Sequence, residues 1–117
     1  MKTILITFTI LFIGTFSYGQ NKNAKASIKV DGVCMMCKKR IEKASIKTKG
    51  VKSAVWNVET HELKLIFDEN KTSIEQIESN VTAVGHDTKS FVASKEAYES
   101  LHPCCKYRED VVIEDHK

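Results

Sequence analysis

The four cysteines of this 117-residue chain form two pairs, and their thiols are its strongest candidates for chemistry. Cys34 and Cys37 are spaced C-x-x-C, whereas Cys104 and Cys105 are adjacent and follow His102 closely. Thiolates bind soft d¹⁰ ions, and a pair of thiols can also cycle with a disulfide. The surrounding sequence must therefore distinguish metal binding, redox chemistry and a structural disulfide.

The first pair lies where a predicted strand leads into a predicted helix. Residues 25–30 alternate between two faces as a half-buried strand does. From Cys37 the apolar spacing becomes helical, and Gly50 fits a helix stop. A helix N-terminus favours a thiolate, and the lysines that follow lower the thiol pKa further. Two thiolates suffice for Cu(I) or Hg(II), whereas Zn(II) usually takes four ligands.

The remaining patterns predict the order β-α-β-β-α-β. The predicted strands cover residues 25–30, 51–58, 63–68 and 87–93, and a second helix begins near Ser73. This order indicates an α+β, ferredoxin-like sandwich, with two helices on one face of a four-stranded antiparallel sheet. We expect Trp56 to serve in core or edge packing only. Further core candidates are Ile41, Val51, Val55, Leu63, Leu65 and Ile77.

The first nineteen residues resemble a secretory signal peptide. Lys2 precedes an apolar run from Ile4 to Phe16, and the small residues Ser17 and Gly19 predict cleavage after Gly19. The run is shorter than the roughly 20 residues that span a bilayer, so we expect no stable membrane insertion after cleavage. The protein is therefore expected to be periplasmic or secreted, where disulfides persist. Four cysteines allow three disulfide pairings.

The stretch V-D-G-V-C-M-M-C-K-K-R-I-E-K-A, with the later G-V-K-S-A-V-W-N-V and V-G-H-D-T, resembles the heavy-metal-associated domain family. This family includes small copper chaperones, the periplasmic mercury-binding protein and N-terminal modules of copper-transporting ATPases. The resemblance covers residues 24–93. It implies a ferredoxin-like fold, Cys34 and Cys37 as the two metal ligands, and hand-over of the ion to a partner by ligand exchange.

The metal-binding loop departs from the family pattern. The family usually reads G-M-x-C, whereas this chain reads Gly32-Val33-Cys34, one residue shorter. The methionine that normally packs beneath the loop has no counterpart, and Met35 and Met36 lie between the cysteines instead. We expect these two methionines to pack in the loop, although a thioether can also assist Cu(I).

Histidines and the second cysteine pair are candidate auxiliary ligands. In this family the loop that contains His86 approaches the metal, so His86 is a third ligand, a neighbour that tunes the thiolates, or an exposed loop residue. The C-terminal extension, residues 94–117, carries the sequence His-Pro-Cys-Cys. His102, Cys104 and Cys105 could bind their own ion, add thiolates to the first site, form a disulfide with it, or remain oxidation-prone thiols.

These observations predict an exported carrier of a soft ion that is not an enzyme. Cu(I) is the first candidate, Hg(II) the second, and Zn(II) a third. A metal-transporting membrane protein or another thiol-bearing acceptor would receive the ion, and Lys38, Lys39 and Arg40 would orient acidic partners. We expect a monomer or a metal-bridged dimer.

Other classes of function fit the sequence less well. A net charge of only +3 does not favour nucleic-acid binding. The alternative function is a periplasmic thiol–disulfide oxidoreductase, because C-x-x-C at a helix start permits one. Against it, the element order differs from that of thioredoxin, and the only proline, Pro103, lies in the extension.

Overall fold

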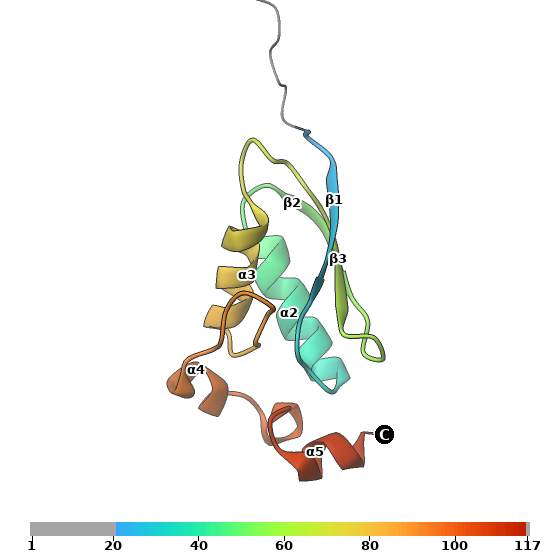
Figure 1. Ribbon diagram of the computed structural model, residues 1–117, viewed down its shortest axis with the longest axis vertical. Helices are drawn as coiled ribbons and strands as arrows, with labels where there is room; N and C mark the ends of the chain where they lie inside the picture. The colour runs from blue at the N-terminus through green and yellow to red at the C-terminus, as the bar shows by residue number, and fades with distance from the viewer. Residues whose placement is uncertain (1–20, 117) are drawn as a thin grey trace, which may run out of the picture.

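The computed structural model describes residues 21–116, in which two helices pack against a sheet (Figure 1). The predicted signal peptide, residues 1–19, lies outside the described residues. None of the described helices has the length and apolar character needed to cross a membrane. The elements are β1 (Ala24–Lys29), α2 (Met35–Lys47), β2 (Val51–Trp56), β3 (Glu62–Phe67), α3 (Ile74–Ala83), α4 (Lys95–Glu99), the 3₁₀ turn η2 (Pro103–Cys105) and α5 (Asp110–Asp115).

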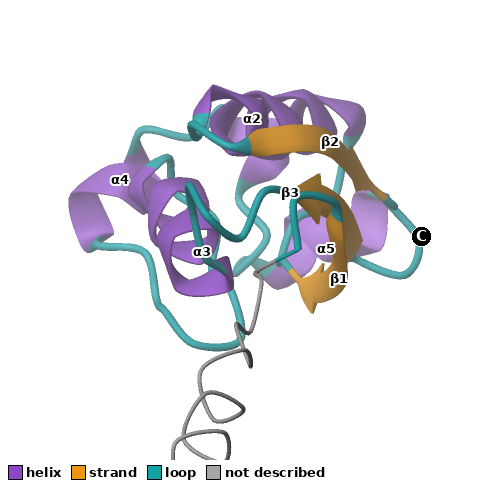
Figure 2. Ribbon diagram, turned by 90° about the horizontal axis from the view of Figure 1, so that it is seen from above, coloured by secondary structure: helices purple, strands orange, loops and turns teal. Residues whose placement is uncertain are grey.

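The sheet is antiparallel, with β3 between β1 and β2. Leu63 is paired with Ile28 on one side and with Trp56 on the other. Leu63, Leu65 and Phe67 are buried, whereas Glu62, which precedes them, and Lys64, which follows Leu63, are exposed. This alternation directs one face of the sheet towards α2 and α3, which lie on the same side of it (Figure 2). The predicted α+β arrangement of helices on one face is therefore confirmed.

The prediction of a fourth strand over residues 87–93 is wrong, because the sheet in the described part of the chain has three strands. Only one isolated bridge, between Val30 and Thr88, stands in its place. The Thr88 N–H donates to the Phe91 carbonyl at 2.9 Å, and the Thr88 hydroxyl donates to the buried Glu78 carboxylate at 2.9 Å. Because these contacts satisfy polar groups within a tight loop, the segment is not free to form a ladder with β1.

One core prediction also fails, because β2 is irregular. A bulge between Val51 and Ser53 shifts the register against β3. Ala54 and Trp56 consequently face the core, whereas Val55 is 53% exposed. The extra residue of a bulge reverses the side-chain alternation of all positions beyond it. The other predicted core residues, apart from the partly buried Val51, are fully or almost fully buried.

The C-terminal extension is folded against one end of this domain. Ser94 caps α4 by accepting a hydrogen bond from the Ala97 N–H, and Pro103 begins η2. In Figure 1 the extension lies below the sheet and helices, at the end where β1 leads into α2. This is the end that carries the C-x-x-C loop.

Candidate metal centre

All four cysteines meet at the N-terminal end of α2. The Sγ atom of Cys34 lies 3.3 Å from that of Cys37, 3.0 Å from that of Cys105 and 3.8 Å from that of Cys104. The Sγ atoms of Cys104 and Cys105 are 3.9 Å apart. All four thiols are free, so no disulfide joins them. The sequence left open whether Cys104 and Cys105 form a separate site or join the first one. In the structure they lie beside Cys34 and Cys37.

The position of Cys34 favours a thiolate. Cys34 is the N-cap residue of α2, and the first turn of this helix contains no acidic residue that would oppose a negative charge. Burial by itself would raise the pKa of Cys34, but hydrogen bonds from Cys105, Cys37 and Cys104 outweigh it and lower the pKa to about 7. Burial raises the pKa of Cys37 and of Cys105, so these two groups remain thiols at neutral pH.

This difference predicts an early thiolate titration. Because its pKa is lowered, Cys34 loses its proton as the pH rises through about 7, well before an ordinary thiol does. Ultraviolet thiolate absorbance of the reduced, metal-free protein should show this step, and Cys34→Ser should remove it. Thiolate formation that begins only near pH 9 in both proteins would contradict the assigned environment.

Trp56 supports the loop from below, a role that sequence reasoning missed. Its indole N–H donates to the Val30 carbonyl at 3.0 Å, and its side chain is buried. A Cβ atom on Gly32 would lie 3.0 Å from two atoms of the Trp56 ring and 3.1 Å from the Cβ atom of Cys37. The glycine therefore allows the short loop to approach the ring closely. Trp56 lies under the loop, where the family's usual methionine is missing.

The two methionines between the cysteines are exposed rather than packed beneath the loop. Met36 nevertheless has its Sδ atom 3.5 Å from the Sγ atom of Cys104. The expectation that these methionines pack in the loop is therefore wrong, and the alternative, a thioether that assists Cu(I), stays a prediction for Met36. Met36 contributes a fifth sulfur atom at the edge of the cysteine group.

His86 is not one of the residues that form the sulfur group. It is fully buried, its Nδ1 atom lies 2.8 Å from the Asp31 carbonyl, and its ring stacks on Tyr107. A carbonyl only accepts, so Nδ1 carries the proton, while Nε2 is buried without a hydrogen-bond partner. Burial lowers the pKa of His86 to about 4, so the ring is neutral at pH 7. The three-ligand cluster found within the described residues does not include it. The reading as an exposed loop residue is wrong.

His102 and Lys38 form hydrogen bonds or ion pairs with nearby groups. The His102 ring accepts a hydrogen bond from the Cys104 N–H at 3.5 Å, which caps η2. The Lys38 ammonium pairs with Glu42 and donates to the Trp56 carbonyl. Lys39 is exposed and Arg40 is half-buried. Of the three predicted partner-binding residues, Lys39 is thus the most accessible.

Comparison with known proteins agrees with this geometry. A sequence profile described as the heavy-metal-associated domain matches residues 27–87, more than half of the chain. The chain belongs to this family. The resemblance to this family that the loop and strand motifs indicate is therefore confirmed.

Individual relatives support the same assignment. The copper chaperone CopZ of Staphylococcus haemolyticus (strain JCSC1435) is 33% identical over 63 residues, which cover 53% of this chain and 93% of CopZ. The N-terminal domain of a potential copper-translocating P-type ATPase from Bacillus subtilis, solved in its Cu(I)-loaded state, superposes with a TM-score of 0.55 at 26% identity. That match covers 57% of this chain and 85% of the domain.

A further solved structure shares the fold. Oxidized MerP from Ralstonia metallidurans CH34 superposes with a TM-score of 0.50 at 23% identity, covering 56% of this chain and 96% of MerP. The family profile ends at residue 87. Cys104 and Cys105 therefore lie in a part of the chain that the family description does not reach.

Proposed function

We propose that this protein carries Cu(I), binding it with the thiolates of Cys34 and Cys37 and passing it to a thiol-bearing acceptor. The observation that carries the proposal is the contact between these two sulfur atoms, 3.3 Å apart at a helix N-terminus. A relative named as a copper chaperone and a domain solved with Cu(I) favour copper over other soft ions. Hg(II) is the next candidate, because it shares the preference for thiolates.

Transfer would proceed by ligand exchange without net redox change. A thiolate of the acceptor binds the ion as one thiolate of the carrier leaves, and the leaving sulfur recovers a proton from solvent as the acceptor thiol loses one. Cys37 is fully buried, whereas Cys34 is 9% and Met35 58% exposed, so an acceptor would approach from the side of Cys34 and Met35. Exposed Lys39 would favour an acidic acceptor surface.

We further propose that the carrier is exported and is not an enzyme. Export rests on the sequence pattern of residues 1–19. A metal-transporting membrane protein is the natural class of acceptor for such a carrier. The similar N-terminal domain of a potential copper-translocating P-type ATPase was solved in its Cu(I)-loaded state, which favours a domain of this kind as the acceptor.

A transfer experiment tests this function. The reduced protein, loaded with one equivalent of Cu(I), is mixed with the metal-free N-terminal domain of a copper ATPase, and the two are separated by ion exchange. Copper is expected to redistribute to the domain faster than it does from a small-molecule chelator of equal affinity. The Cys34→Ser/Cys37→Ser protein is expected to retain no copper before mixing. A loaded protein that never releases copper to the domain would contradict the carrier role.

A further inference from the structure

A three-sulfur group joins the loop to the C-terminal extension. The Sγ atoms of Cys34, Cys104 and Cys105 all lie within 4.8 Å of one another. Metal–thiolate bonds of about 2.3 Å place three sulfurs around one ion about 4 Å apart. Two of the three separations, 3.8 and 3.9 Å, already match this spacing. The third, 3.0 Å between Cys34 and Cys105, needs to open by about 1 Å.

The loop pair by itself is further from its own ideal geometry. A linear two-thiolate ion with bonds of about 2.3 Å requires sulfurs about 4.6 Å apart. The sulfurs of Cys34 and Cys37 are 3.3 Å apart. Cys34 is common to both groups, so an ion held by Cys34 could exchange Cys37 for the two cysteines of the extension without leaving the protein.

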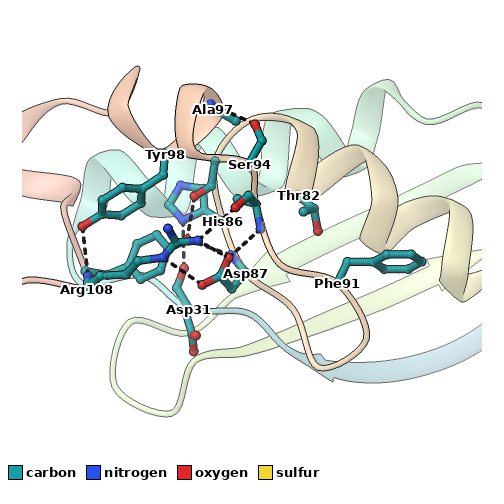
Figure 3. Close-up of polar contacts among 12 residues, drawn as sticks. Asp31, Thr82, His86, Asp87, Phe91, Ser94, Ala97, Tyr98 and Arg108 are labelled. Carbon is teal, nitrogen blue, oxygen red and sulfur yellow. Dashed lines mark hydrogen bonds and ion pairs between the residues drawn. The ribbon is translucent and has the colours of Figure 1, made fainter.

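The extension is held in place by contacts that involve no sulfur (Figure 3). The Tyr107 hydroxyl donates to the Gly85 carbonyl at 2.6 Å and accepts from the Asp87 N–H at 2.9 Å. The Arg108 guanidinium pairs with the Asp87 carboxylate at 2.7 Å and donates to the Ala93 carbonyl at 3.1 Å. These contacts fix Cys104 and Cys105 beside the loop before any ion arrives, so little ordering entropy opposes their binding.

The surroundings of this group also suit a soft ion. Cys105 is fully buried, and Cys104 is partly buried with the Met36 thioether 3.5 Å away. An ion among these sulfurs would be screened from water on the side of Cys105. No carboxylate or imidazole joins the cluster within the described residues. An all-sulfur ligand set selects soft ions over hard ones.

We propose that Cys34, Cys104 and Cys105 form a second position for the ion, in which it is held by three thiolates. This inference rests on the proposed function, because it concerns the same Cu(I) cargo. Cys34 and Cys37 receive the ion, and the extension then replaces Cys37 to retain it. Each protonated thiol that binds the ion releases its proton to solvent, and the Cys37 thiolate takes one up when it leaves. Release of the ion to an acceptor requires the sulfurs of Cys104 and Cys105 to dissociate from it.

X-ray absorption of the protein with one equivalent of Cu(I) tests the second position. Three sulfur neighbours are expected in the unsubstituted protein and in Cys37→Ser. Two are expected in Cys104→Ser/Cys105→Ser, with an affinity lower by about 10- to 100-fold. Two sulfurs and equal affinity in the unsubstituted and Cys104→Ser/Cys105→Ser proteins would overturn the inference and leave the carrier function intact. Failure of the unsubstituted protein to bind Cu(I) would instead overturn the carrier function.

A variant outside the sulfur group controls for misfolding. Arg108→Gln removes the ion pair with Asp87 but keeps all four cysteines. It is expected to lower the affinity less than Cys104→Ser/Cys105→Ser does and to retain three sulfur neighbours. Circular dichroism should show an unchanged fold in both. If Cys104→Ser/Cys105→Ser is folded and still shows three sulfur neighbours, the extension is not the source of the third ligand, and the proposal is wrong.

Discussion

Replacing Cys34 with serine is expected to lower the affinity for Cu(I) by more than about 100-fold. Loss of a residue that only hydrogen-bonds to a metal ligand already lowers metal affinity by about 10- to 100-fold, and loss of the ligand itself should lower it further. The Sγ atom of Cys34 lies within 3.8 Å of the Sγ atoms of all three other cysteines. Its removal breaks both the loop pair and the three-sulfur group. It also removes the thiol whose pKa is lowered to about 7, which is the one most readily available as a thiolate.

Competition against a chromophoric Cu(I) chelator measures this loss. Cys37→Ser is the matched control, since it removes a neighbouring thiol of the same loop but leaves Cys34 with Cys104 and Cys105. We expect a smaller loss for Cys37→Ser than for Cys34→Ser. Equal losses would indicate that the loop pair acts alone, and a Cys34→Ser protein that binds as tightly as the unsubstituted one would exclude Cys34 as a ligand.

Replacing Trp56 with alanine is expected to lower the free energy of unfolding by about 3–5 kcal/mol. The ring is buried against Gly32, and its N–H satisfies the Val30 carbonyl. Removal leaves a cavity under the metal-binding loop and an unpaired carbonyl. Since small domains have only about 5–15 kcal/mol of stability, this loss removes a large share of it.

Chemical denaturation followed by circular dichroism measures this effect, because Trp56 is the only tryptophan and its fluorescence disappears with it. Trp56→Phe keeps most of the ring but loses the donor, and is expected to cost about 1–3 kcal/mol. Val55→Ala, on the exposed face of the same strand, should change stability by less than about 0.5 kcal/mol. Equal stability of Trp56→Ala and Val55→Ala would contradict the role of Trp56.

Local patterns were sufficient to predict most of the domain. The alternation in β1 and β3 and the helical spacing after Cys37 are patterns of apolar and polar residues close together in the chain. Such patterns can be read directly from the sequence. The second helix begins near Ser73 as predicted, and the Ser73 side chain caps it by accepting a hydrogen bond from the Gln76 N–H. The position of the C-x-x-C pair at a helix start follows from the same local signals.

The errors arose where non-local contacts decide the conformation. A bulge in β2 is not marked by any residue type, so the sequence pattern predicts the wrong face for Val55. The segment 87–93 has strand-like residues, but buried Glu78 and the loop closed by Thr88 hold its polar groups instead. Burial of His86 by Tyr107 is similarly a contact between distant segments.

The second half of the site depends on contacts across the longest sequence separations. Cys34 and Cys105 are 71 positions apart, and the family pattern ends before the extension begins. The sequence allowed Cys104 and Cys105 to join the first site but gave no reason to prefer this over an independent site. Tyr107 and Arg108, which anchor the extension, belong to no motif and carry no signal of their own.

We propose that the loop cysteines make this protein a Cu(I) carrier. The most direct test is a titration of the reduced protein with Cu(I) in competition with a chromophoric chelator, beside Cys34→Ser/Cys37→Ser. We expect the unsubstituted protein to withdraw one equivalent of Cu(I) from the chelator and the double variant to withdraw none. Undiminished binding by the double variant, or no withdrawal by the unsubstituted protein, would contradict the claim.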